Sequence, residues 1–333
     1  MSEYALPWLV ADVGGTNARF GLVRRPGGPP EAIAVLRDAD HEDLPEAVAA
    51  YLADHAGGVR PGAACLAIAG PVSGDRYHLT NAGWTGSVRD LGLPSALLLN
   101  DFEALALALP GLGEGDLAPV GGPEHKTTGV REVKAVLGPG TGLGVAGLVP
   151  APEGWVPVPS EGGHVTAPAT TERELAVLRA LRADGLRHVV AEHLLSGPGL
   201  SRLYRGLALV DGAPADPPPP AEILAAAVTD ARCAETVGMF CALLGAFAGN
   251  VALTLGARGG IYLGGGILPR MLDHLRASDF RRRFEATPRL HEYLAAIPTQ
   301  VITADYPALM GAAAWLTRHI VGNNTVRTDM ENR

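Results

Sequence analysis

The residues best suited to chemistry lie in two short glycine-rich segments that follow apolar runs. The first reads Asp12-Val13-Gly14-Gly15-Thr16-Asn17, and the second reads Gly138-Pro139-Gly140-Thr141-Gly142. Because glycine has no Cβ, backbone N–H groups in such turns can approach phosphate oxygens closely. Neither segment has the GxxxxGK[ST] spacing of a P-loop. Either one alone is compatible with a plain hairpin turn, but the pair predicts a nucleotide-phosphate site.

Two further features extend this predicted nucleotide site. Asp12 stands just before the first turn, where its carboxylate could hold Mg²⁺ through water while the metal bridges phosphates. The cluster Gly264-Gly265-Gly266 follows an apolar run and precedes Ile267-Leu268-Pro269. A flat base could lie against this bare backbone, although a tight strand-to-helix turn would explain the glycines equally well.

Asn100 and Asp101 are the candidates for the acceptor side of a phosphoryl transfer. They follow the apolar run 96–99 and precede the strong helix formers of 103–109. A carboxylate at a helix N-terminus is stabilised as the anion. Phosphoryl transfer needs the acceptor hydroxyl aligned and its proton accepted, which Asp101 could do. The alternative role for Asp101 is that of a plain helix cap.

Carboxylates and imidazoles recur in two later segments, Ser160-Glu161-Gly162-Gly163-His164 and Glu192-His193. A polyol needs such groups, because each hydroxyl donates one hydrogen bond and accepts others. These residues could equally be solvated surface groups. Their spacing is not that of HExxH and no cysteine is near, so no metal cage is predicted.

The elements that must position these residues alternate between strand-like and helix-like patterns. Strands are expected at 8–13, 19–24, 63–69, 96–99, 133–137, 144–149 and 300–303, and helices at 41–55, 103–109, 171–183, 200–207, 221–255, 268–275 and 308–320. Each glycine-rich turn sits between two strand-like runs, so the second unit echoes the first. Two α/β lobes facing each other across a cleft are therefore predicted.

Composition limits the class of protein. A chain of 333 residues with 47% apolar residues suits two domains, and the formal net charge of −8 argues against a nucleic-acid partner. The three cysteines form no CxxC pair and are expected to be free buried thiols in a reducing cytoplasm. The uncharged run 239–257 is interpreted as a buried helix rather than a membrane span, because it holds three glycines, Asn250 and Thr254.

Taken together, the motifs resemble the bacterial glucokinases of the enterobacterial type. The resemblance runs in order along nearly the whole chain and rests on the segments 9–19, 99–102, 138–144, 161–164, 192–200 and 264–270. It implies the two-lobed, actin-like (ribonuclease-H-like) ATPase fold of hexokinases with an interlobe cleft. A small domain would comprise 1–112 and 305–333, and a large domain 113–304. It also implies ATP, Mg²⁺ and glucose as ligands, and a cytoplasmic homodimer that does not bind membranes.

The resemblance assigns a role to each candidate residue. Asp101 would be the general base toward the sugar 6-hydroxyl, and Asn100, Glu161, His164 and Glu192 would hold the remaining hydroxyls. The ATP phosphates and adenosine would lie against Ala11, Asp12, Val13, Gly14, Gly15, Thr16, Thr141, Gly142, Gly264, Gly265 and Gly266. Pro139 departs from the alanine that is frequent in the family and removes one N–H donor. The cysteine cluster that binds zinc in the related repressor/open-reading-frame/kinase family does not follow His164.

Three other functions share the fold. A kinase for fructose, mannose or an amino sugar would keep the same base. A sugar-responsive transcriptional regulator would need a helix-turn-helix ahead of Asp12, where this sequence has eleven residues. An ATP-driven chaperone or filament subunit would not need the polar set that suits a sugar.

Overall fold

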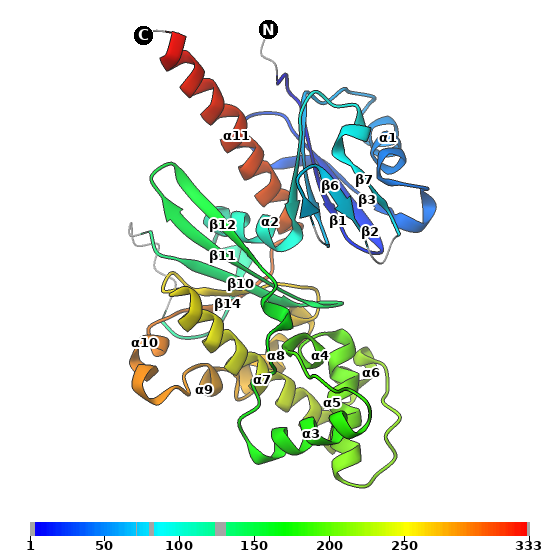
Figure 1. The fold of residues 1–333 in the computed structure, drawn as a ribbon, viewed down its shortest axis with the longest axis vertical. Helices are drawn as coiled ribbons and strands as arrows, with labels where there is room; N and C mark the ends of the chain where they lie inside the picture. Colours follow the sequence, from blue (N-terminus) through cyan, green and yellow to red (C-terminus); the bar gives the residue numbers. More distant parts are fainter. Residues whose placement is uncertain (1–3, 71, 80–82, 124–130, 332–333) are drawn as a thin grey trace. The chain divides into compact units, whose positions relative to one another are not determined.

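A computed structural model describes residues 4–70, 72–79, 83–123 and 131–331, with side chains described up to residue 320. The chain packs as two compact α/β units (Figure 1). Unit 1 comprises Met1–Gly113 and Ala304–Arg333, and unit 2 comprises Glu114–Thr303.

Unit 1 is built on a five-stranded sheet with the order β3-β2-β1-β4-β8. Its strands are β1 (Trp8–Val13), β2 (Asn17–Val23), β3 (Pro30–Arg37), β4 (Ala63–Ile68) and β8 (Ala96–Asn100). β1 pairs antiparallel with β2 and parallel with β4, and β4 pairs parallel with β8. β4 is buried at every residue, which explains its continuous apolar sequence.

The helices of unit 1 cover this sheet. Helix α1 (Leu44–Asp54) packs against β2 and β3, and helices α2 (Asp101–Ala108) and α11 (Pro307–Glu331) pack tightly against each other. A Cβ on Gly311 would lie 1.7 Å from the carbonyl oxygen of Ala104, so only glycine permits this approach of α11 to α2. α11 lies on the opposite side of the sheet from α1 (Figure 1).

Unit 2 repeats the same arrangement with one more strand, in the order β12-β11-β10-β13-β14-β9. The strands are β9 (Leu117–Gly121), β10 (Lys134–Pro139), β11 (Leu143–Ala151), β12 (Gly154–Ser160), β13 (Ile261–Leu263) and β14 (Thr299–Ile302). β10 pairs antiparallel with β11 and parallel with β13, as β1 does with β2 and β4.

Eight helices complete the described part of unit 2: α3 (Glu172–Ala183), α4 (Ala191–Leu194), α5 (Gly197–Val210), α6 (Pro220–Ala226), α7 (Ala231–Leu255), α8 (Leu272–Ala277), α9 (Phe280–Phe284) and α10 (His291–Ala295). α7 passes through the core, packed against α5, α9 and β10. It is the single described helix long and apolar enough to span a membrane, and 78% of its most apolar window is buried inside the protein. The interpretation of 239–257 as a buried helix is therefore confirmed.

Several expectations about elements need correction. The single helix expected over 221–255 is two, because Asp230 caps a new helix by accepting a hydrogen bond from the N–H of Cys233 at 2.8 Å. Strands β3, β9 and β12 were not predicted. Nor was a small three-stranded sheet of β5 (Val72–Ser73), β6 (Arg76–His78) and β7 (Thr85–Ser87). Cys65, Cys233 and Cys241 are free and buried, as expected.

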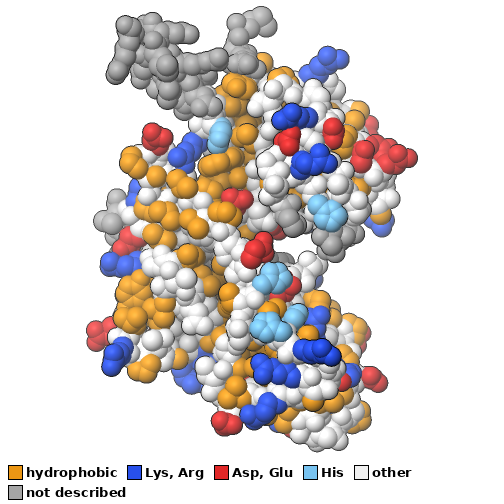
Figure 2. Space-filling model, viewed as in Figure 1, with side chains coloured by type: hydrophobic (Ala, Val, Ile, Leu, Met, Phe, Trp, Pro, Cys, Tyr) orange, Lys and Arg blue, Asp and Glu red, His pale blue; other side chains and the backbone are white. Residues whose placement is uncertain are grey.

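A pair of apolar side chains on neighbouring strands of unit 2 lies at the surface. Val149 on β11 and Val156 on β12 stand directly opposite each other and are 36% and 39% exposed. Hydrophobic side chains gather over this region of unit 2 (Figure 2). Because β12 is the edge strand of its sheet, this apolar pair lies beside an unpaired strand edge.

Candidate active site

Two acidic candidate residues of unit 1, Asp12 and Asp101, lie at the same edge of its sheet. In the parallel registers, Val13 lies beside Ile68, and Ile68 lies beside Asn100. The carboxyl ends of β1, β4 and β8 therefore come together, as is usual for ligand sites of open α/β sheets. Asp12, near the end of β1, and Asp101, just after β8, are close enough for the charge of Asp12 to act on Asp101.

The junction between β8 and α2 is held by a reciprocal capping box. The side-chain oxygen of Asn100 accepts a hydrogen bond from the N–H of Phe102 at 2.9 Å, and Glu103 accepts one from the N–H of Asn100 at 3.0 Å. Asn100 also donates to the carbonyl of Gly70 at 3.4 Å. Asn100 is thus the cap, which leaves Asp101 as the first residue of the helix. The plain helix-cap role for Asp101 is wrong.

Asp101 has the electrostatics of a proton acceptor that works near neutral pH. Burial is the main cause that raises the pKa of Asp101 to about 7, and the nearby negative charge of Asp12 raises it further. Hydrogen bonds, including one from the N–H of Phe102 at 3.0 Å, oppose this shift. A pKa near the working pH is favourable for a general base.

Asp12 is paired with a residue that the motif analysis left without a role. The guanidinium of Arg19 lies 3.2 Å from the Asp12 carboxylate, across the antiparallel register of β1 and β2. Burial raises the pKa of Asp12, and Arg19 opposes that shift. A half-buried carboxylate with one cation beside it is a hard oxygen donor that a hydrated Mg²⁺ fits.

The first glycine-rich turn, 14–16, leaves N–H groups available. The N–H of Gly14 is used inside the turn, where it donates to the carbonyl of Asn17 at 3.0 Å. The carbonyl of Thr16 accepts from the N–H of Asp38 at 3.0 Å, which anchors the turn to the end of β3. Among the described residues, the N–H groups of Gly15 and Thr16 have no partner. They can donate to an anion.

The second glycine-rich turn, 140–142, is held by two backbone hydrogen bonds of Gly140. The N–H of Gly140 donates to the carbonyl of Gly142 at 2.8 Å, and the carbonyl of Gly140 accepts from Gly197 at the start of α5 at 2.8 Å. The N–H groups of Thr141 and Gly142 have no partner within the described chain. Pro139 ends β10 opposite Leu143.

The third glycine cluster lies directly against this second turn. The N–H of Gly264 donates to the carbonyl of Leu137 at 2.8 Å. A Cβ on Gly138 would lie 2.5 Å from the carbonyl oxygen of Gly264, and one on Gly265 would lie 2.4 Å from that of Pro139. Gly265 also has a φ of 88°, which disfavours other residues. The structure therefore brings 138–142 and 264–266 into one surface of bare backbone.

Three of the residues expected to bind sugar, Glu161, His164 and Glu192, lie near one backbone position, Leu143. Its N–H donates to the carboxylate of Glu192 at 2.9 Å. A Cβ on residue 163 would lie 2.0 Å from the carbonyl oxygen of Leu143, so only glycine fits at that position. The imidazole of His164 lies 3.9 Å from the Glu161 carboxylate, and both side chains are exposed. Glu161, His164 and Glu192 thus belong to one region of unit 2.

Two residues of this site were missed from the sequence. Arg19 falls inside the quoted motif, and its cross-strand position opposite Asp12 follows from the hairpin register. Glu103 is three residues after Asn100, the spacing of a capping box, and that pattern could have identified it.

Comparisons with known proteins agree with this geometry. The family profile described as Glucokinase matches residues 9–319. The chain is 48% identical over 322 residues to a glucokinase of Aromatoleum aromaticum, covering 95% of this chain and 96% of that one. It is 46% identical over 321 residues to a glucokinase of Neisseria gonorrhoeae, covering 94% and 96%.

Solved structures show the same fold. A glucokinase from an Antarctic psychrotroph superposes with a TM-score of 0.83 at 37% identity, covering 93% of this chain and 98% of that one. A ROK family glucokinase from Streptomyces griseus in complex with glucose and AMPPNP superposes with a TM-score of 0.61 at 20% identity, covering 94% and 100%. Fold and site together define an ATP-dependent sugar kinase with the two-lobed, actin-like ATPase fold.

Within that class, the assignment follows from the extent of the match. The chain belongs to the glucokinase family.

Proposed function

We propose that this chain transfers the γ-phosphoryl group of ATP to the 6-hydroxyl of D-glucose, giving glucose 6-phosphate and ADP, with Asp101 as the general base. The observation that carries the proposal is the placement of Asp101. It follows the capped end of β8, is partly buried beside Asp12, and has a pKa raised to about 7. A carboxylate in this state can accept the hydroxyl proton as the new O–P bond forms.

The remaining roles follow from the donors and acceptors in each unit. Asn100 in unit 1 and Glu161, His164 and Glu192 in unit 2 would bind the other sugar hydroxyls. The free N–H groups of Gly15, Thr16, Thr141 and Gly142 would hold phosphate oxygens, because bare backbone N–H groups suit anions. The surface formed by 138–142 and 264–266 would accept adenosine, since no Cβ separates a flat base from the backbone.

Mg²⁺ is the proposed metal, with Asp12 as its ligand through water. The metal would neutralise charge on the ATP phosphates, which this chain otherwise meets mainly with uncharged backbone donors. The guanidinium of Arg19 lies 3.2 Å from the Asp12 carboxylate and opposes the rise in the pKa of Asp12 that burial causes. Full turnover in excess chelator would exclude this role for the metal.

A direct test replaces Asp101 by asparagine. Asp101→Asn keeps the shape of the side chain but cannot accept the proton, so turnover should fall by about 10² to 10⁴-fold while glucose binding persists. Coupled assays of kcat and calorimetry with glucose measure the two effects. Asp54→Asn, an exposed acid at the end of α1, is the matched control and should leave turnover unchanged. A variant retaining more than about a tenth of turnover would fall outside that range and remove Asp101 from the role of base.

Substrate choice within the hexoses is tested separately. Fructose, mannose and amino-sugar kinases share the fold and the base, so a panel of hexoses in the coupled assay compares kcat/KM directly. Glucose should give the highest value, because the family to which the chain belongs is that of the glucokinases.

We also propose a cytoplasmic homodimer, as the family resemblance implies. The exposed pair Val149 and Val156 beside the free edge of β12 is a surface that a second copy could bury. Light scattering coupled to size exclusion should give twice the chain mass of 34.4 kDa. A mass of one chain at micromolar concentration would contradict the dimer.

A further inference from the structure

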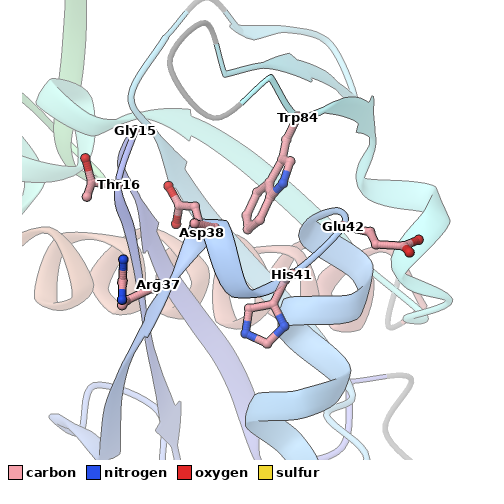
Figure 3. A pocket seen from close by; sticks show the side chains of 8 residues that line it. Gly15, Thr16, Arg37, Asp38, His41, Glu42 and Trp84 are labelled. Atoms are coloured by element: carbon pink, nitrogen blue, oxygen red, sulfur yellow. The ribbon is translucent and has the colours of Figure 1, made fainter.

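Unit 1 contains a cavity of about 310 Å³ beside the first glycine-rich turn. It lies between that turn, the end of β3 and the segment that carries Trp84 (Figure 3). The lining residues are Gly15, Thr16, Arg37, Asp38, Ala39, His41, Glu42 and Trp84. The volume is at the lower end of small-molecule sites, which begin at about 300 Å³.

Asp38 is the unusual group in the wall of this cavity. Its side chain is buried, with the residue only 5% exposed, and neither carboxylate oxygen has a hydrogen-bond partner among the described residues. Asp38 stands beside Trp84 in the wall (Figure 3). Leaving a buried charged acceptor unsatisfied is unfavourable, so such groups call for a donor.

The described residues do not supply that donor. Arg19 and His41 are near enough to lower the pKa of Asp38 against the larger effect of burial. The guanidinium of Arg19, however, makes its hydrogen bond to Asp12 instead. The backbone of Asp38 is fully engaged, with its N–H donated to Thr16 and its carbonyl accepting from His41 at 3.2 Å. Only the carboxylate is left to bind something else.

The lining carries charges of both signs, which favours a neutral ligand. Arg37 is exposed at the rim and opposes a cation, whereas Asp38 and Glu42 oppose an anion. In the described part of the chain no group of three or more His, Cys, Asp or Glu side chains could hold a metal ion. A neutral polyol can form hydrogen bonds with both kinds of charged group, because its hydroxyls donate to carboxylates and accept from arginine.

Trp84 adds the apolar half of such a site. It is 5% exposed and lines the cavity beside Asp38, the first residue of η1, the short 3-10 helix Asp38–Asp40. The small exposed part of the indole can contact C–H groups of a sugar ring whose hydroxyls reach Asp38. The combination of one aromatic side chain with a few convergent polar groups is typical of small-molecule sites.

We propose that this cavity is a second hexose-binding subsite, in which Asp38 accepts hydrogen bonds from sugar hydroxyls and Trp84 packs against the ring. The choice of a hexose rests on the proposed function, since that sugar is present wherever the enzyme turns over. Because the N–H of Asp38 holds the carbonyl of Thr16, an occupied subsite stabilises the first turn in the position seen here.

The test observes Trp84 directly in the full chain. The chain has four tryptophans, so 5-fluorotryptophan labelling gives four ¹⁹F resonances, and Trp84→Phe identifies the one of interest. Glucose without nucleotide should shift the Trp84 resonance in the wild type. Asp38→Asn should raise the midpoint of that shift about tenfold or more, as expected for a lost hydrogen bond to a charged group. The adjacent exposed Asp40→Asn is the matched control and should leave the midpoint unchanged.

A further variant separates this subsite from the proposed catalytic sugar site. Glu161→Ala should raise KM for glucose and leave the Trp84 midpoint unchanged. A Trp84 resonance that does not move with glucose in the wild type, or whose midpoint follows Glu161→Ala and ignores Asp38→Asn, overturns the subsite. Glucose phosphorylation with a static Trp84 resonance refutes only the subsite, whereas a moving resonance without phosphorylation refutes only the proposed reaction.

Discussion

The two glycine-rich hairpins have the same architecture but different chemistry. Each is formed by the central strand of its sheet and an antiparallel neighbour, with a parallel strand on the other side: β2-β1-β4 in unit 1 and β11-β10-β13 in unit 2. The β1–β2 hairpin carries the ion pair of Asp12 and Arg19 beside its turn. In the β10–β11 hairpin the corresponding positions hold glycine and apolar residues, with Gly138 opposite Gly144.

This difference suggests that the two hairpins have different roles in binding and catalysis. The charged hairpin lies next to Asp101. Its Asp12 is suited to binding a metal, and the charge of Asp12 raises the pKa of Asp101. The neutral hairpin packs against 264–266 and offers backbone to a nucleotide. Its acidic partner, Glu192, comes from α4 and binds the backbone of Leu143 rather than a cation. Changes to the neutral hairpin should therefore act through shape, and changes to the charged hairpin through metal and pH.

Between the two hairpins, the larger effect is expected from filling space in the neutral hairpin. A Cβ on Gly142 would lie 2.5 Å from the Glu192 carboxylate, so Gly142→Ala should displace that carboxylate from the N–H of Leu143. Misplacement of about 1 Å can cost roughly 10²-fold in rate, and we expect kcat/KM to fall by about that factor. Gly140→Ala is the control, because a Cβ there meets nothing within 4 Å. Equal losses in both variants would mean that the close approach of Glu192 is not the cause.

A smaller effect, of a different kind, is expected from the charged hairpin. Asp12→Asn keeps the hydrogen bond to Arg19 but loses the negative charge, so the half-saturating concentration of Mg²⁺ should rise. We expect kcat/KM to fall about tenfold, which corresponds to about 1.4 kcal/mol of transition-state stabilisation. Thr141→Val in the neutral turn should leave the Mg²⁺ requirement unchanged. If both variants have the Mg²⁺ titration of the wild type, the metal does not depend on Asp12.

The smallest effect concerns the support of Asn100 and Asp101. Glu103→Ala removes the hydrogen bond to the N–H of Asn100 and should lower the free energy of unfolding by about 1 kcal/mol, the usual net value of such a bond. Denaturant titration measures this change in the free energy of unfolding. The exposed Asp54→Ala is the control, for which the change should be near zero. Glu103→Gln should be close to wild type, because its amide oxygen can accept the same bond. A Glu103→Ala variant as stable as the wild type would show that the capping box is dispensable.

The sequence predicted most of the elements that carry the site, because their signals are local. The glycine-rich turns, the run 96–99 before Asn100 and the apolar strand at 63–69 all match described elements. The echo between the two units is confirmed by their common strand order. The roles of the individual site residues and the domain boundaries near residues 112 and 305 stay predictions.

What the sequence did not reveal depends on contacts between distant segments. β3 has no clear alternation because five of its eight residues are exposed at the sheet edge. β12 contains two prolines and is recognisable only by its pairing with β11. The unsatisfied carboxylate of Asp38 is defined by burial under Trp84 and the first turn, which no periodicity encodes.

The most direct test of the central claim is the pH dependence of kcat/KM for glucose. Since the pKa of Asp101 is raised to about 7, the base is protonated and inactive below that pH and becomes active as the pH rises through it. We predict an acid limb with a midpoint near pH 7, displaced to lower pH in Asp12→Asn because the charge of Asp12 contributes to the shift. A profile that is flat from about pH 5.5 to about pH 8.5 in the wild type would contradict the assignment of Asp101 as the general base.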